Sequence, residues 1–179
     1  MKLNLGCGPH VIDGWKNYDL DAKPYVIKHD LSRGLPNDIQ PNTVDFIYTE
    51  HFIEHVEKHE AIKLFRDCFR VMKPTAVMRI STPDMYNLAM SYINDDMSGI
   101  PTIWKPETPC DMINEGMRLW GHKYLWDFGE LSRALTGVGF KSIRSAKWKE
   151  SDYAALNNLE VRPFCNDLIV EVTKEVGWA

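Results

Sequence analysis

A glycine-rich turn is the first feature of the sequence that could do chemistry. Gly6-Cys7-Gly8 directly follows a short strand-like run, Lys2 to Leu5. Glycines adopt positive φ without strain and let backbone N–H groups approach a ligand closely. A dinucleotide fingerprint would have a third glycine where this chain has Val11. The turn alone therefore fits a ligand loop and a structural tight turn equally well.

Two acidic residues follow the next two strand-like runs. Asp19 lies at the end of the run from Lys16 to Leu20, and Asp30 comes just after the run from Tyr25 to Lys28. A carboxylate at the end of such a strand can accept hydrogen bonds from both hydroxyls of a ribose. Asp30 is placed to accept one from an adenine amino group. Each acid alone is also explained as a cap or loop residue, but the order of turn, acid and acid favours a nucleotide site.

These residues belong to an ordered set of motifs that covers nearly the whole chain. The set resembles that of the class I S-adenosylmethionine (SAM)-dependent methyltransferases, and within them a small group known only as predicted methyltransferases. The motifs are LNLGCG (3–8), GWKNYDLD (14–21), HDLSRGLP (29–36), DFIYTEHFIEHV (45–56), RVMKP (70–74), RISTPD (79–84) and HKYLWDFGELSRALTGVGF (122–140).

The resemblance implies a role for each matching position. The turn would hold the methionine end of SAM through its backbone, and Asp19, with its neighbour Leu20, would bind the ribose. Asp30 would bind the adenine amino group, and Leu31 would offer its backbone N–H to the ring. Thr49 would face the sulfonium. The expected cofactor-binding residues are thus Gly6, Cys7, Gly8, Asp19, Leu20, Asp30, Leu31 and Thr49.

The order of strand-like and helical patterns predicts an α/β fold. The resemblance makes it a doubly wound, mostly parallel seven-stranded sheet of Rossmann-like type, with an antiparallel last strand and a central first strand. We expect one domain over residues 1–179. Besides the runs above, strands are expected at 44–48, 77–81, after Phe140 and at 167–173, and helices at 52–72 and after Asp127.

The chain departs from the family pattern in three ways. Only ten residues separate Gly8 from Asp19, and about five separate the second and third strands. Parallel neighbours normally need a crossover of a dozen or more residues, so either the early helices are shortened to turns or the third strand is wrong. No helix precedes the first strand, and Thr75-Ala76 replaces the usual glycine pair. The first two departures would leave apolar sheet surface uncovered, which suggests a homodimer.

A long irregular segment follows the fifth strand. Residues 84–124 hold five of the eight methionines, two tryptophans and three prolines, with short helices expected after Asp84 and Asp111. An insertion at this place would lie over the carboxyl ends of the strands, where open α/β sheets bind ligands. We interpret it as a substrate lid, with packing over the core as the alternative.

Histidines supply the candidate catalytic groups. His51 and His122 are the candidate bases, because histidine is the side chain most easily poised near neutral pH. A plain structural hydrogen bond is the alternative for His122. His51, Glu54 and His55, with His59 further on, resemble a metal-binding helix of some methyltransferases. Glu54-His55 also occurs without a metal in relatives, and the prediction is that no metal binds.

Composition limits the remaining possibilities. A net charge of −4 argues against a dedicated nucleic-acid surface, although 141–149 could carry a local basic stripe. The four cysteines have no disulfide or zinc spacing, no signal peptide is seen, and no apolar run is long enough to span a membrane. We therefore expect a cytoplasmic protein.

The function expected from all of this is transfer of a methyl group from SAM to a small acceptor. The nucleophile would be an oxygen or nitrogen, and a saccharide-related acceptor is favoured weakly. Two alternatives stay open: a binding module that holds SAM or a nucleotide without turnover, and an NAD-dependent oxidoreductase, which Val11 disfavours.

Overall fold

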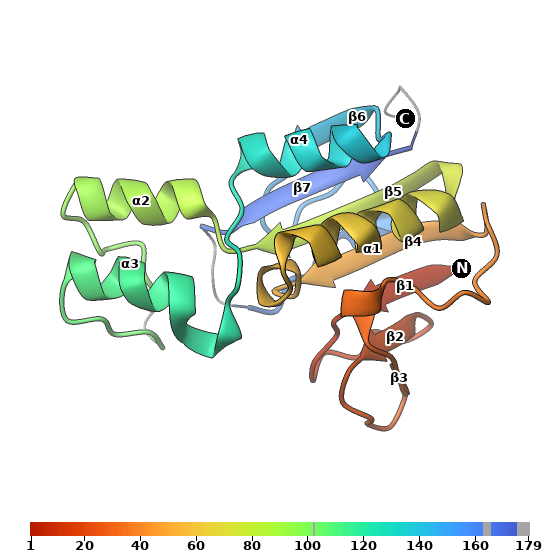
Figure 1. Ribbon diagram of the computed structural model, residues 1–179, viewed down its shortest axis with the longest axis horizontal. Helices are drawn as coiled ribbons and strands as arrows, with labels where there is room; N and C mark the ends of the chain where they lie inside the picture. The colour runs from red at the N-terminus through yellow and green to blue at the C-terminus, as the bar shows by residue number, and fades with distance from the viewer. Residues whose placement is uncertain (102, 163–165, 175–179) are drawn as a thin grey trace.

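A mixed sheet of seven strands organises the chain (Figure 1). The computed structural model describes residues 1–101, 103–162 and 166–174. The strand order is β3-β2-β1-β4-β5-β7-β6, and only β7 and β6 are antiparallel to their neighbours. The expected fold is thereby confirmed, including the central first strand and the antiparallel last one. The strands are β1 (Lys2–Leu5), β2 (Lys16–Asp19), β3 (Val26–Lys28), β4 (Val44–Glu50), β5 (Met72–Thr82), β6 (Ser142–Ser145) and β7 (Leu168–Thr173).

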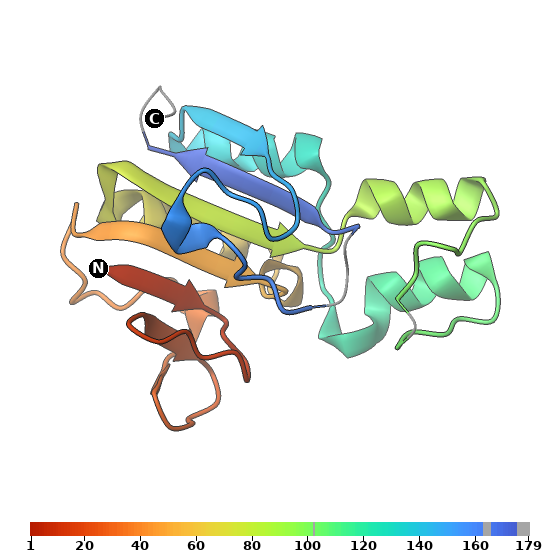
Figure 2. The ribbon, with the colours of Figure 1, turned by 180° about the vertical axis from the view of Figure 1, so that it is seen from behind.

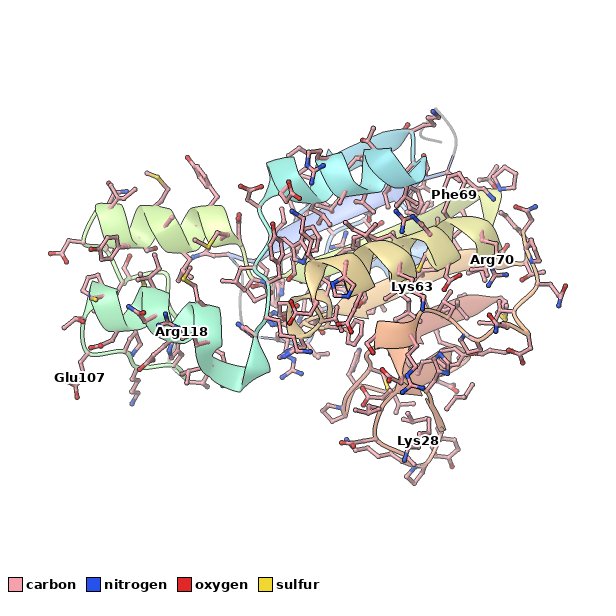
Figure 3. The ribbon with its side chains drawn as sticks, in the orientation of Figure 1. Lys28, Lys63, Phe69, Arg70, Glu107 and Arg118 are labelled. Carbon is pink, nitrogen blue, oxygen red and sulfur yellow. The ribbon has the colours of Figure 1, made fainter. Side chains whose placement is uncertain are left out.

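The helices fall into two groups with different places in the fold. In Figure 1, α1 (Lys58–Val71) and α4 (Phe128–Val138) cover one face of the sheet, whereas α2 (Met85–Ile93) and α3 (Pro109–Arg118) project beyond the ends of β4 and β5. Figure 3 labels Glu107 and Arg118 on the projecting part, and Phe69, which packs edge to face on Phe140, over the sheet. The short 3₁₀ helices are η1 (Leu31–Arg33), η2 (Ile53–His55), η3 (Leu119–Gly121) and η4 (Ala154–Leu156).

The first three strands run parallel without crossover helices. Registers such as Leu3 with Lys16 and Tyr18 with Ile27 confirm both the third strand and the shortened connections. The buried Asn17 side chain holds the loop between β1 and β2. Its Oδ1 accepts from the Ile12 N–H at 2.9 Å and its Nδ2 donates to the Ile12 carbonyl at 3.1 Å. This amide supplies backbone partners that a crossover helix would otherwise provide internally.

The two faces of the sheet are covered by different structures. Alternation along each strand sends Leu3, Ile47 and Ile80 into the large core under α1 and α4. Tyr48 and Val77 point the other way, where Leu156 of η4 packs on them together with Trp15. The connection between β6 and β7, residues 146–162, crosses that second face (Figure 2). The chain thus covers sheet surface on which the homodimer expectation rested, and the homodimer itself stays a prediction.

The crossing connection is tied to the sheet by a buried arginine. Arg79 of β5 is fully buried and its Nε donates to Glu160 of the connection at 2.5 Å. Its Nη1 donates to Glu171 of β7 at 2.8 Å, and its Nη2 to the Lys147 carbonyl at 2.7 Å. Glu160 also accepts from the Lys149 N–H at 2.9 Å. One guanidinium therefore joins both ends of the connection to two neighbouring strands.

Several boundaries differ from the sequence predictions. The helix expected from Phe52 begins at Lys58, because Glu57 and Glu60 form a capping box there and η2 precedes it. It ends at Val71 rather than Met72, and β5 begins directly at Met72. None of the helices in the described ranges has both the length and the apolar character needed to cross a membrane.

Replacing Arg79 by methionine is expected to destabilise the protein strongly. The change leaves Glu160 buried without its cation, while Glu171 loses one of its two arginines and keeps Arg144. Leaving a buried charge without its partner typically costs about 3–5 kcal/mol. Urea unfolding followed by circular dichroism measures the loss. The control is Arg133→Met, which removes an exposed ion pair with Glu130 and is expected to change the free energy of unfolding by less than about 0.5 kcal/mol. Equal losses in both variants would contradict the anchoring role of Arg79.

Candidate active site

A first cavity of about 230 Å³ opens at the carboxyl ends of β1 and β4. This is the edge of the sheet where open α/β folds bind ligands. The glycine turn forms one wall of the cavity, and the end of the crossing connection forms another. Its lining residues are Asn4, Gly6, Cys7, Pro9, His10, Glu50, Val161 and Arg162.

The two glycines of the turn are required for different reasons. Both have positive φ, +66° at Gly6 and +52° at Gly8. A Cβ on Gly6 would lie 2.4 Å from the Phe52 ring, so this glycine also permits close packing. A Cβ on Gly8 would meet only the Arg162 guanidinium, at 3.9 Å, which leaves that side of the turn accessible. Between them, burial and the charge of Asp19 raise the pKa of the Cys7 thiol to about 11, which favours the protonated thiol at neutral pH.

Asp19 lies against the glycine turn. Its Oδ2 accepts from the Gly8 N–H at 2.7 Å and its Oδ1 from the Asp21 N–H at 3.1 Å. The carboxylate therefore fixes the conformation of the turn. Each oxygen retains a second lone pair that can accept from a ligand.

Glu50 is the acidic group that the sequence predictions missed. It is the last residue of β4, 8% exposed, and lines the first cavity. Its Oε1 accepts from the backbone N–H groups of Val161 and Arg162, at 3.0 and 2.9 Å. This carboxylate thus draws the end of the crossing connection over the glycine turn. An acid at the carboxyl end of a central strand was the signal for it in the sequence.

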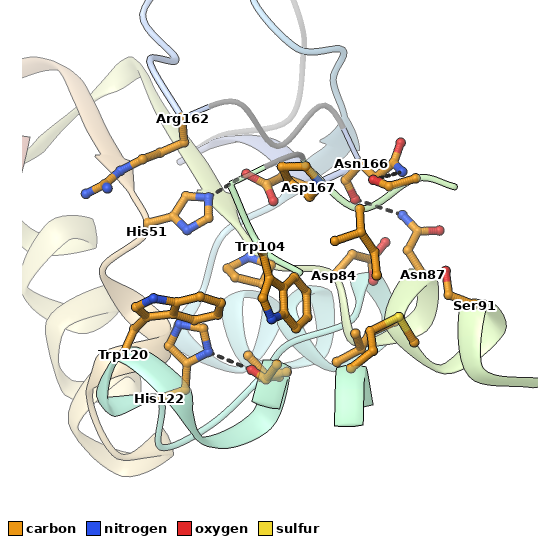
Figure 4. A pocket seen from close by; sticks show the side chains of 18 of the residues that line it. His51, Asp84, Asn87, Ser91, Trp104, Trp120, His122, Arg162, Asn166 and Asp167 are labelled. Atoms are coloured by element: carbon orange, nitrogen blue, oxygen red, sulfur yellow. Dashed lines mark hydrogen bonds and ion pairs between the residues drawn. The ribbon is translucent and has the colours of Figure 1, made fainter. Parts of the chain in front are cut away.

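A second and larger cavity, of about 370 Å³, lies under the projecting helices (Figure 4). Trp104, Trp120 and Met112 supply apolar surface, and Asp84 and Asn87 of the α2 end supply polar groups. The ring centroids of Trp104 and Trp120 are 5.4 Å apart in an edge-to-face arrangement. Arg162 lines this cavity as well as the first one, so the two cavities share a wall.

His51 stands at the edge of the second cavity between two carboxylates. Its Nε2 lies 2.6 Å from Asp167 Oδ2, drawn as a dashed line in Figure 4, and its Nδ1 lies 3.3 Å from Glu54 Oε1. Burial alone would lower the pKa of His51, but the hydrogen bonds to Asp167 and Glu54 outweigh it and raise the pKa to about 10. With both ring nitrogens facing carboxylates, His51 serves as a donor and an anchor.

His122 reaches the same wall from a distant part of the chain. Its Nδ1 lies 2.7 Å from the Gly116 carbonyl and donates to it, which leaves the Nε2 lone pair as the other ring position. The N–H groups of Lys123 and Tyr124 donate to the Glu54 carbonyl at 2.7 and 3.2 Å. These bonds hold His122 beside His55, with their ring centroids 5.0 Å apart.

Solved structures of other proteins share the fold of this chain. A SAM-dependent methyltransferase from Archaeoglobus fulgidus superposes with a TM-score of 0.58 at 18% identity, over 97% of this chain and 85% of that one. One from Mesorhizobium loti gives a TM-score of 0.57 at 19% identity, over 96% and 90%. A possible histamine N-methyltransferase from Thermotoga maritima gives 0.60 at 14%, over 97% and 81%. Neither a protein-family model nor a curated protein matches the chain.

The chain has the fold of the SAM-dependent methyltransferases. Within this methyltransferase fold, the predicted site residues fall into three groups. Gly6 and Cys7 line the first cavity. Gly8 follows them in the turn, and Asp19 is hydrogen-bonded to the Gly8 N–H. His51 and His122 line the second cavity. The other four lie outside the lining of both.

Those four residues surround the ends of β2, β3 and β4. Leu20 is 62% exposed just after β2, while Leu31 is buried in the core. Asp30 caps η1 by accepting from the Ser32 N–H at 3.1 Å, and the hydrogen bonds from Ser32 hold its pKa below the usual value. Thr49 is buried within β4 rather than beyond it, and no hydrogen-bond partner reaches its Oγ1. Their assignment to the cofactor stays a prediction.

The segment expected to be a lid should open more readily than the sheet. None of the described residues of helix α2 is buried, whereas Val77 to Ser81 of β5 are all buried. Segments with few buried contacts open locally at low free energy. Amide hydrogen exchange in α2 and α3 is therefore expected to be at least about tenfold faster than in Val77–Ser81. Equal protection of the two regions would contradict a lid.

Proposed function

We propose that the chain transfers the methyl group of SAM to a hydroxyl group of a small polar acceptor. The observation that carries this proposal is the pair of adjoining cavities. One is lined by the glycine turn and Glu50, with Asp19 bonded to the back of that turn, and the other is lined by tryptophans and hydrogen-bonding groups. Arg162 belongs to both linings. A donor group in the first cavity can therefore lie next to an acceptor in the second.

The residues of the first cavity fit SAM. The open side of Gly8 admits a ligand to the backbone of the turn. The Asp19 and Glu50 carboxylates match the ribose hydroxyls and the methionine ammonium, and the Arg162 guanidinium matches the methionine carboxylate. The adenine end would extend over the ends of β2 and β3, toward Leu20, Asp30 and the backbone of Leu31. Thr49 is buried in β4, directly before Glu50.

SAM would supply an activated methyl carbon, which a nucleophile attacks in line with the departing sulfur. The residues of this chain then have the tasks of alignment and exclusion of water. The hydrogen bond from the Arg162 N–H to Glu50 holds the end of the crossing connection over the turn. Trp104 and Trp120 cover the acceptor side. In the transfer the acceptor oxygen would gain the methyl group, the carbon–sulfur bond would break with its electrons on sulfur, and the hydroxyl proton would pass to His122.

The second cavity supports a hydroxylated ring of the saccharide class as the acceptor. Tryptophan faces pack on the apolar face of such a ring, and a few placed polar groups fix its orientation. The polar groups that line this cavity are Asp84, Asn87, Ser91 and Asn166. Their acceptor oxygens and amide donors suit several hydroxyls at once, which favours an oxygen over a nitrogen nucleophile.

His122 would be the base that takes the proton from the nucleophile. Its Nε2 is the ring nitrogen left over by the bond to Gly116, and the residue lines the acceptor cavity. His51 would act as a positioning residue, since both of its nitrogens face carboxylates. Its task would be to hold Asp167 and Glu54 in place around the cavity.

Two alternative functions, a binding module and an oxidoreductase, differ from methyl transfer in the nucleotide that is bound and in whether it is consumed. A module that only holds the nucleotide would bind SAM without consuming it, and an oxidoreductase would bind NAD. Calorimetry with SAM, S-adenosylhomocysteine and NAD, followed by an acceptor screen with methyl-labelled SAM, distinguishes them. Binding of SAM with transfer of label to a hydroxylated acceptor is the expected result.

Replacing Asp19 by alanine is expected to weaken SAM binding about 10- to 100-fold, because hydrogen bonds to a charged group are worth about 1.5–3 kcal/mol. Asp19→Asn keeps one acceptor oxygen and should fall between the wild type and alanine. Calorimetry measures the affinities, and thermal unfolding checks that each variant is folded.

The matched control is Asp21→Ala, which removes the same charge from an exposed residue two positions on. It is expected to change the affinity for SAM by less than about threefold, about 0.6 kcal/mol. A larger loss at Asp21 than at Asp19 would move the ribose contact to Asp21. No loss at either position would contradict the cofactor site.

Replacing Trp120 by alanine is expected to raise the KM for the acceptor about tenfold, because an aromatic surface of the acceptor cavity is lost. The affinity for SAM should not change, since Trp120 does not line the first cavity. Leu119→Ala is the control, because Leu119 is a neighbouring exposed residue outside both cavity linings. Steady-state kinetics with the screened acceptor gives both constants. A parallel loss in SAM affinity would contradict the division into two cavities.

A further inference from the structure

Three groups capable of binding a metal meet at the floor of the second cavity. One ligand atom each from Glu54, His55 and His122 lies within 4.8 Å of the other two. His55 and His122 also line the cavity, so a cation held there would face its interior. From the sequence alone, the prediction for this region was that no metal binds.

The central group is a buried carboxylate that faces two histidines. Glu54 is 0% exposed, and its Oε2 accepts from the Thr82 hydroxyl at 3.0 Å. Its Oε1 lies 3.3 Å from His51 Nδ1 and 3.8 Å from His55 Nε2. A carboxylate oxygen has two lone pairs, so Oε1 can face His51 on one side and bind a cation on the other.

His55 and His122 each place one ring nitrogen within 4.8 Å of a carboxylate oxygen of Glu54. Nδ1 of His122 donates to the Gly116 carbonyl, which fixes the tautomer that leaves Nε2 as a lone-pair donor. Nε2 is the nitrogen that His55 turns toward Glu54. A ligating histidine commonly donates its other N–H to a carbonyl in this way, because the bond sets both tautomer and ring orientation.

The backbone keeps these ligands together although they are far apart in sequence. The backbone N–H groups of Lys123 and Tyr124 donate to the carbonyl of Glu54 itself. These bonds hold the residues that follow His122 against η2, which carries Glu54 and His55. His51 braces the carboxylate from the opposite side and is itself held by Asp167. Ligand orientation of this kind exists before any cation binds, which lowers the cost of forming the site.

We propose that Glu54, His55 and His122 bind one first-row divalent cation whose remaining coordination positions face the acceptor cavity. Two imidazoles and one carboxylate suit ions from manganese to zinc and leave positions open for further ligands. An acceptor hydroxyl takes one of these positions, a role that rests on the proposed methyl transfer. With Nε2 of His122 on the cation, the cation takes over the activation that the free imidazole would otherwise supply. Coordination lowers the pKa of the hydroxyl, its proton passes to water, and the oxygen then attacks the methyl carbon.

The test is titration of the chelator-treated full-length protein with Co²⁺, followed by calorimetry and by visible absorption. One Co²⁺ is expected to bind per chain. His122→Gln and His55→Gln should each lower the affinity at least about tenfold, since changes even to groups behind the ligands cost 10- to 100-fold. Mg²⁺, which prefers oxygen ligands, should bind more weakly.

The control is His59→Gln, which removes an exposed histidine of α1 outside the cluster and should leave Co²⁺ binding unchanged. Thermal unfolding confirms that each variant is folded, and Glu54 is left intact because it is fully buried. Absence of Co²⁺ binding to the wild type, or equal binding to all variants, overturns the proposal.

A parallel titration with SAM separates the two proposals. Cobalt binding without SAM binding would support the metal site and contradict the proposed function. SAM binding without cobalt binding would support the cofactor site of the proposed function and contradict the metal site.

Discussion

The buried guanidinium of Arg79 is the interaction on which the rest of the structure depends. It pairs with Glu160 of the crossing connection and Glu171 of β7, and it also donates to the carbonyl of Lys147. Removing any partner leaves charge in a dry interior, so these groups must come together in one arrangement. That arrangement brings the connection back across the sheet and delivers Val161 and Arg162 to Glu50. Arg162 lines both cavities. Both cavities therefore depend on Arg79 of β5, because the ion pair of Arg79 with Glu160 positions the connection that carries Arg162.

The site combines a rigid part and a more loosely packed part. The ends of β1, β2 and β4 are fixed by parallel registers and by buried asparagines, so the glycine turn and its acids have a defined geometry. The projecting helices α2 and α3 pack on each other through contacts such as Leu88 with Gly116, and expose much of their surface. Under the proposed function, the rigid part would hold the methyl donor and the looser wall would contact the acceptor.

The sequence predicted those parts of the fold that local patterns determine. The glycine turn after β1, the cap at Asp127 and the end of α1 near Pro74 each depend on a few adjacent residues. Long-range partners were not predictable in this way. Glu50 meets residues 111 and 112 positions away, and His122 reaches Glu54 through backbone bonds that no periodicity encodes. The start of α1 was misplaced because the apolar pattern continues through η2, where the same residues pack without α-helical hydrogen bonds.

The order of the chain has a consequence for when the site exists during synthesis. β7 is the last strand, and it contributes Glu171, one of the two acids that neutralise Arg79. The crossing connection also emerges late, so the glycine turn leaves the ribosome long before Val161 and Arg162 can close over it. A nascent chain that ends before Glu160 has five strands in parallel and an arginine whose two acidic partners are both missing. Arg162 belongs to the lining of both cavities, so both are completed only after the crossing connection has been synthesised.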